Sequence, residues 1–211
     1  REQGVPVEAE ANRRIQELER PVKEFANKHL NSVPNFSECM NILPNLKALL
    51  NALERADADG VHPKQRDYAW GTLAEACVRI ARLETLSCDD ELSTFVKDVL
   101  IRASSHSEPA PDPQHDARFD ESPSWGSPAA RIEAAKGLIL LARHKPCADS
   151  EVLDAIQRLS EDPVPAVRYQ IASHLNTLYR TAPELMWCIA ERMSQKEQSR
   201  GVLQGFLVSL S

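Results

Sequence analysis

Residues that could bind a cation gather between positions 104 and 127. This segment carries Asp112, Asp116 and Asp120 close to His106 and His115. Carboxylate oxygens and imidazole nitrogens are common metal ligands, but a calcium loop needs a defined ligand spacing and a glycine turn. The segment has neither of these features. The pattern therefore favours a solvated acidic loop over a metal site, and we expect no cofactor.

The short motifs that mark several enzyme classes are missing. The sequence has no glycine-rich phosphate-binding loop, no HExxH pair and no GxSxG nucleophile elbow. Its six histidines stand singly, so no two of them form a metal-binding pair on one helix face. We therefore expect a binding surface and predict that the chain is not an enzyme.

Arg131 and Arg168 occupy the same place in a repeated segment. Pro128–Arg131 reads Pro-Ala-Ala-Arg, Pro165–Arg168 reads Pro-Ala-Val-Arg, and a weaker third copy is found at Pro63–Arg66. An arginine near the start of a helix could bind an anionic partner. The alternative, which we favour, is an ion pair with an acidic residue of a neighbouring repeat, such as Asp162 for Arg168.

Three aromatic side chains are further candidates for contact with a partner. Phe119 and Trp125 lie in the acidic segment, where they could anchor its docking on a basic partner. Trp125 could instead pack on the helix that follows it, and we favour this interpretation. Trp187 lies in an expected helix, but the face it occupies is ambiguous. With Arg131 and Arg168, these residues form the predicted partner-binding set.

The composition indicates an all-α fold. The 211 residues are 42% hydrophobic and 27% charged, with seven glycines and only 5% aromatic residues. An all-β fold would need more turn glycines and β-branched runs, whereas alanine, leucine, glutamate and arginine favour helices. The net charge is −6, with the acidic excess in residues 1–126, so neither half has the basic surface that is typical of nucleic-acid binding.

Cysteine usage and hydropathy suggest a compartment. The five cysteines are an odd number, are widely spaced and include no CxxC pair. This is typical of a reduced, cytoplasmic protein whose thiols act as small core residues. The longest strongly apolar run, Leu138–Ala142, is too short to cross a membrane. Because the chain begins at Arg1, we expect it to be a piece of a longer protein.

The apolar spacing predicts helices separated by turns. We expect them over 8–30, 37–58, 63–83, 89–103, 128–143, 150–159, 165–180 and 202–210. A further helix should follow a capping box formed by Thr181 and Glu184. Pro21 should kink or break the first helix near Arg20. The proline-rich segment 104–127 should remain a loop or linker between helical pairs in 1–103 and repeats in 128–211.

Part of the chain resembles a HEAT repeat. The residues that carry the resemblance are a first helix with Val152, Ile156 and Leu159, the turn Asp162-Pro163, and a second helix that Val167-Arg168 opens. The match is good over 150–180, fair over 127–144 and weak over 63–83 and 183–210, where Leu207 and Leu210 would correspond to Leu175 and Leu178. The resemblance implies an α-solenoid of stacked antiparallel helix pairs.

This interpretation leads to two functional hypotheses. The first is a protein-interaction scaffold, or a regulatory or sensor module of a larger intracellular protein, that holds another protein or another domain of its own polypeptide. The second is a HEAT-like nucleic-acid-binding protein or DNA glycosylase-type enzyme. The acidic net charge opposes the second, because binding to DNA depends on phosphate neutralisation. We therefore expect a protein partner and neither nucleic acid nor a membrane.

Overall fold

The computed structural model describes residues 7–210, and every regular element in this range is a helix. In chain order the elements are α1 (Val7–Lys28), α2 (Phe36–Leu53), α3 (Pro63–Ala81), α4 (Glu91–Ala103), α5 (Pro113–Glu121), α6 (Ala130–Leu141), η1 (Lys145–Cys147), α7 (Ser150–Leu159), α8 (Pro165–Ala172), η2 (Leu175–Arg180), α9 (Pro183–Lys196) and α10 (Arg200–Leu210). The all-α prediction is confirmed.

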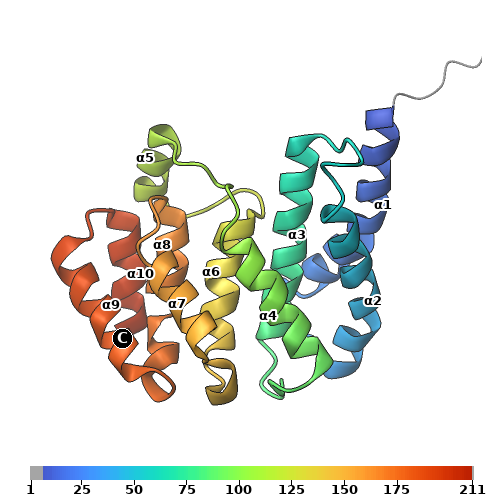
Figure 1. The fold of residues 1–211 in the computed structure, drawn as a ribbon. Coiled ribbons are helices and arrows are strands. Elements are labelled where there is room, and N and C mark those ends of the chain that lie inside the picture. Colours follow the sequence, from blue (N-terminus) through green and yellow to red (C-terminus); the bar gives the residue numbers. More distant parts are fainter. Residues whose placement is uncertain (1–6, 211) are drawn as a thin grey trace, which may run out of the picture.

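The described helices pack in two rows (Figure 1). We call α1, α3, α6, α8 and α10 the five-helix row, since they contact one another in that order, and α2, α4, α7 and α9 the four-helix row. Helices of the five-helix row all start at the upper edge of Figure 1, whereas those of the four-helix row run in the opposite direction. Successive helices along the chain are therefore antiparallel, apart from the short α5.

The repeated segments of the sequence fall in the same row. Helices α3 and α8 begin at Pro63 and Pro165, and α6 begins two residues after Pro128. The repeated Leu73, Leu138 and Leu175 are all at most 1% exposed. The two rows pack closely on each other, because a Cβ atom added at Gly137 of α6 would lie 2.7 Å from the side chain of Leu100 of α4. The repeat in the sequence thus reflects a repeated packing position.

Helix α1 runs unbroken through Pro21, so the predicted break near Arg20 is wrong. Proline removes one backbone donor from a helix. On either side of Pro21, however, the buried Ile15, Val22 and Ala26 fix the helix against its neighbours. Packing therefore outweighs the local cost, as it commonly does for helices in a folded protein.

The helix predicted over 165–180 is divided into α8 and the 3₁₀ helix η2. At the junction, the Ser173 hydroxyl donates to the Gln170 carbonyl, and the His174 ring lies 3.0 Å from the same oxygen. Side-chain hydrogen bonds of this kind compete with the backbone ladder of a helix. The predicted capping box is also wrong, because Ala182 precedes α9 and the Thr181 hydroxyl is buried without a hydrogen bond.

Segment 104–127 is not simply a loop, since it contains α5. Pro113 stands in the first turn of α5, and the Asp112 carboxylate accepts a hydrogen bond from the Gln114 amide at 2.9 Å. Phe119 is buried against Tyr169 of α8, with ring centroids 5.5 Å apart. One aromatic anchor is thus enough to seat this polar helix on α8 and α10.

The cysteines depart from the predicted reduced state. Cys88, before α4, forms a disulfide with Cys147 of η1, and the two Cα atoms are 5.4 Å apart. Cys39 and Cys77 are buried thiols, as expected, and burial raises the pKa of Cys39 to about 12. Cys188 is free and exposed. The two cysteines are 59 residues apart in the sequence, so the sequence did not indicate this bond, which joins two neighbouring turns of the fold.

The last helix presents a different face from the one predicted. Its buried residues include Val202 and Phe206, whereas Leu207 is 65% and Leu210 57% exposed. Leu207 and Leu210 therefore do not occupy the buried positions of Leu175 and Leu178. The glycines set the face: Gly205 packs so closely on Tyr169 that a Cβ atom there would lie 2.7 Å from the ring.

Candidate interaction surface

Arg131, near the start of α6, is held entirely by its own chain. Its Nε atom lies 2.7 Å from a carboxylate oxygen of Asp162. One terminal nitrogen donates to the carbonyl of His106 at 2.8 Å, and the other donates to that of Pro109 at 2.7 Å. Arg131 therefore ties segment 104–127 to the turn before α8. The favoured interpretation of this arginine, an ion pair within the repeat array, matches this geometry.

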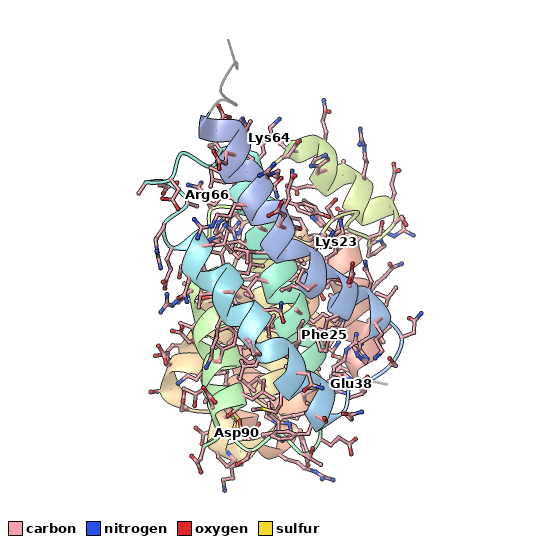
Figure 2. The ribbon with its side chains drawn as sticks, turned by 90° about the vertical axis from the view of Figure 1, so that its right-hand side faces the viewer. Lys23, Phe25, Glu38, Lys64, Arg66 and Asp90 are labelled. Carbon is pink, nitrogen blue, oxygen red and sulfur yellow. A yellow bond between two sulfur atoms is a disulfide. The ribbon has the colours of Figure 1, made fainter. Side chains whose placement is uncertain are left out.

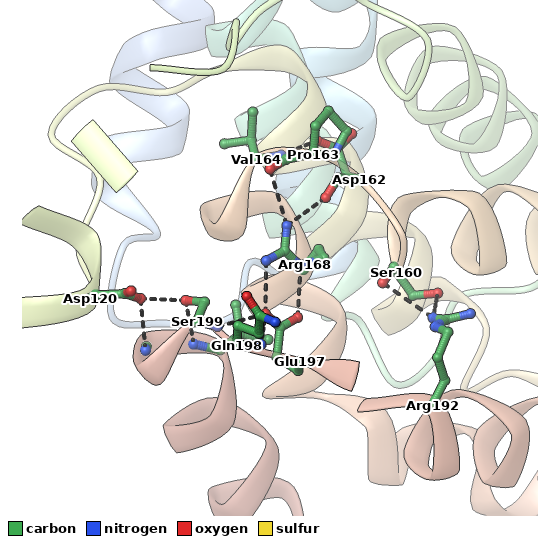
Figure 3. Close-up of polar contacts among 12 residues, drawn as sticks. Asp120, Ser160, Asp162, Pro163, Val164, Arg168, Arg192, Glu197, Gln198 and Ser199 are labelled. Carbon is green, nitrogen blue, oxygen red and sulfur yellow. Dashed lines mark hydrogen bonds and ion pairs between the residues drawn. The ribbon is translucent and has the colours of Figure 1, made fainter. Parts of the chain in front are cut away.

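Arg168 repeats the arrangement one unit later (Figure 3). Its guanidinium donates to both carboxylate oxygens of Glu197, at 2.7 and 2.8 Å, and to the carbonyl of Asp162 at 2.7 Å. The acidic partner is thus Glu197, whereas the Asp162 carboxylate that we suggested for Arg168 pairs with Arg131. Burial alone would raise the pKa of the Glu197 carboxyl, but the hydrogen bonds from Arg168 and from backbone amides outweigh it and lower the pKa.

The acidic partners also bind the backbone that leads into the next helix. The Asp162 carboxylate accepts from the Val164 amide at 2.9 Å, and Glu197 accepts from the Ser199 amide at 2.9 Å. Asp120 of α5 accepts from the Gly201 amide at 3.2 Å and from the Ser199 hydroxyl. Arg131 and Arg168 donate their hydrogen bonds to groups of the same chain. Their role in this structure is therefore to join consecutive turns.

The aromatic candidates lie in three different settings. Phe119 is buried, as described above. Trp125 is half-buried and lies edge-on to His115, at 5.8 Å between ring centroids, beside a pocket of about 530 Å³ that also includes Phe119 in its wall. Trp187 is 60% exposed on α9. Of the five predicted residues, the structure thus brings Phe119 and Trp125 together and places only Trp187 fully at the surface.

The acidic segment offers no cation site. No group of three or more His, Cys, Asp or Glu side chains that could hold a metal ion occurs in the part of the chain that the structure describes. Two of the three aspartates have structural roles instead: Asp112 caps α5 and Asp120 binds the start of α10. The nearby His106 lies 3.7 Å from Asp67 of α3.

A polar face extends across α1, α3 and α6. Its contacts between α1 and α3 are well formed: Thr72 donates to Glu19 at 2.8 Å, Lys23 to the Tyr68 hydroxyl at 2.8 Å, and Arg79 to the Ala26 carbonyl at 3.2 Å. Figure 2 shows Lys23 on the side of α1. Such satisfied contacts make this half of the face a fixed part of the fold.

Glu133 and Lys136 of α6, on the same face, are different. Both are half-buried, yet within residues 7–210 no hydrogen bond or ion pair joins either side chain to another residue. Burial and the nearby Glu75 carboxylate raise the pKa of Glu133 to about 7. Burial also lowers the pKa of Lys136. This pair was not predicted from the sequence, although two charged residues among the apolar side chains of α6 could have indicated it.

We expect that Glu133→Gln will stabilise the protein at pH 8 by about 2 kcal/mol and have little effect at pH 5. The folded-state pKa of Glu133 is raised to about 7, so the folded state binds this proton more tightly than the unfolded chain. The resulting stability is complete below the unfolded-state pKa and is lost as the pH rises through the folded-state pKa. Urea unfolding at both pH values measures the effect.

Glu17→Gln is the control for this prediction, because Glu17 is an exposed carboxylate on α1. It should leave the pH dependence of unfolding unchanged. If Glu133→Gln instead lowered stability at pH 8, the ionised carboxylate would have to be paired and stabilising. The raised pKa of Glu133 would then be wrong.

Comparisons of the chain with models of known families, with curated proteins and with solved structures found no match. No helix between residues 7 and 210 combines the length and the apolar character that a membrane crossing requires.

Proposed function

We propose that this chain is a HEAT-like α-solenoid that serves as a protein-interaction module. Its partner would be another protein, or another domain of the same polypeptide, bound on the polar face of the five-helix row. The two ordered rows of antiparallel helices support the architectural part of the proposal. The arginines that recur at equivalent turns support it as well, because repeat proteins join each unit to its neighbours.

The observation that carries the functional part is the pair formed by Glu133 and Lys136. Half-buried charges that make no hydrogen bond and no close ion pair destabilise a folded protein, and the opposite charges near Glu133 and Lys136 do not outweigh the burial. A bound segment can supply the missing partners: a cation or backbone amide for Glu133, and an anion or backbone carbonyl for Lys136. The surrounding charges are of both signs, with Glu75 near Arg79 and Arg82. This mixture suits a polypeptide better than the uniformly negative backbone of a nucleic acid.

Site-specific photo-crosslinking tests the proposal. A photoreactive amino acid at position 136 should crosslink one discrete protein, or a domain expressed from the same reading frame, in native-host lysate treated with nuclease. The matched control carries the same amino acid at exposed Asp154 of the four-helix row. Adding Glu133→Lys to the position-136 protein should reduce the crosslinked product at least tenfold, since it reverses a charge that the partner must match.

Three outcomes would reject the proposal. Equal crosslinking from positions 136 and 154 would mean that the polar face is not selective. Loss of the product on nuclease treatment would indicate nucleic acid. An unchanged amount of crosslinked product with Glu133→Lys would show that Glu133 does not contribute to binding of the partner.

A further inference from the structure

The exposed large hydrophobic side chains of the described range are confined to the two ends of the helix rows. One set lies at the junction of α1 and α2 and consists of Leu30, Val33, Phe36 and Met40. The other set belongs to η2, α9 and α10 and consists of Tyr179, Trp187, Leu207, Val208 and Leu210. Within residues 41–178 no large hydrophobic side chain is exposed. Apolar surface is thus left open only where each row ends.

The end of the rows formed by α1 and α2 has a groove between the first half of α1 and the second half of α2, separate from the exposed set Leu30, Val33, Phe36 and Met40. The groove has a volume of about 650 Å³, and Figure 2 looks at this end with α1 and α2 nearest the viewer. Its wall combines apolar residues, among them Ala11, Leu18 and Ala52, with charged residues of both signs, among them Glu10 and Arg55. A groove between two helices with apolar residues in its wall is the kind of site that an amphipathic helix occupies.

The opposite end presents a helix of matching character. On α10, Leu203 is half-buried and Leu207 and Leu210 are exposed, at the i, i+4 and i+7 spacing that places them on one side. The helix has 11 residues, which corresponds to about 16 Å. Arg200, three residues before Leu203, begins the same stripe, whereas the buried Val202, Gly205 and Phe206 face the rest of the molecule.

The direction of the helices fixes how the two ends would meet. Neighbours in the five-helix row are parallel (Figure 1), so a helix that extends the row beyond α1 would lie parallel to it. If α10 takes this place, exposed Arg200 at its start falls beside exposed Glu10 near the start of α1. Leu207, seven residues further, then falls near Leu18, eight residues beyond Glu10. Opposite charges and apolar residues thus match in the same register.

We propose that α10 of one molecule docks in the groove between α1 and α2 of a second copy, so that copies associate head to tail. This contact uses two different surfaces of the chain, and such a heterologous contact leaves one free groove and one free α10 in every assembly that does not close into a ring. Assembly therefore proceeds beyond the dimer as concentration rises.

Analytical ultracentrifugation over a concentration series tests the proposal, with the full 1–211 chain in a Cys188→Ser background to exclude disulfide-linked dimers. Dimers and larger species should form with increasing concentration. Leu207→Glu should block one end and Ala11→Glu the other, so each variant alone should remain monomeric. An equimolar mixture of the two should form a one-to-one dimer and nothing larger, because each variant keeps one intact end.

A charge exchange checks the register without altering apolar packing. Glu10→Arg and Arg200→Glu should each weaken association at least threefold, and the double variant should recover it. Asp154→Lys, on the four-helix row, should leave association unchanged. If the parent chain stayed monomeric at every concentration, the proposal would be overturned. The groove and α10 would then have to bind something other than a second copy. A mixture of blocked variants that fails to dimerise would also overturn it.

Discussion

Replacing Arg168 with alanine should lower the free energy of unfolding by about 3–5 kcal/mol. The side chain of Glu197 is only 6% exposed, and Arg168 donates to both of its carboxylate oxygens. Removing the guanidinium leaves that carboxylate buried without its counterion. It also leaves the carbonyls of Asp162 and Pro163 without a donor. The destabilisation thus combines an uncompensated charge with lost hydrogen bonds.

Chemical denaturation with a double-mutant cycle measures this effect. Arg168→Ala combined with Glu197→Ala should be less destabilised than the sum of the two single variants, since the double variant buries no lone charge. Arg13→Ala is the matched control, because its ion pair with Glu17 is exposed and should contribute less than about 0.5 kcal/mol. A loss for Arg168→Ala as small as that of the control would show that the turn is held by other contacts.

Replacing Cys88 with serine should destabilise the folded protein by about 4 kcal/mol. The disulfide with Cys147 closes a loop with a sequence separation of 59 residues. In the chain-entropy account, a cross-link of this length stabilises by restricting the unfolded chain. The bond joins the turn before α4 to η1, so its loss frees two successive turns at one edge of the rows.

Denaturation with and without a reducing agent tests the second prediction. The parent protein should lose stability on reduction, whereas Cys88→Ser should be equally stable in both conditions. Cys188→Ser is the control, since this thiol is exposed and free, and it should behave as the parent does. Titration of free thiols under denaturing conditions gives an independent count: three in the bonded chain. Five free thiols without reductant would contradict the bond.

The repeated packing was predictable because it depends on local patterns. A proline at or just before the helix start and an arginine one turn later recur in α3, α6 and α8, which lie in the same row, although the leucines of the third copy lie in η2. That Arg131 and Arg168 would form ion pairs was predictable from the sequence, but the acidic residue that pairs with Arg168 was not. Which carboxylate meets Arg168 depends on how closely two turns approach, and the spacing between Arg168 and Glu197 along the sequence does not reveal this.

Features that depend on single long-range contacts were not predictable. Composition indicated a loop over 104–127, yet burial of Phe119 between α8 and α10 seats a helix there. Similarly, Cys88 and Cys147 are unremarkable in the sequence and meet only because their turns lie at the same edge. Glu133 and Lys136 are charges among apolar residues of α6, and whether they find a hydrogen bond or a close ion pair depends on how near Glu75 and Arg79 of α3 come to them.

The common direction of the five-helix row has an electrostatic consequence. Each α-helix carries a partial positive charge at its first turn and a partial negative charge at its last turn. With five such dipoles aligned, one edge of the molecule gathers the positive ends, and Glu10, Asp120, Asp162 and Glu197 lie at helix starts along that edge. These carboxylates offset the aligned dipoles. Because the four-helix row runs in the opposite direction and opposes most of the combined dipole, what remains is a local effect at the first turns, where these carboxylates meet the backbone amides.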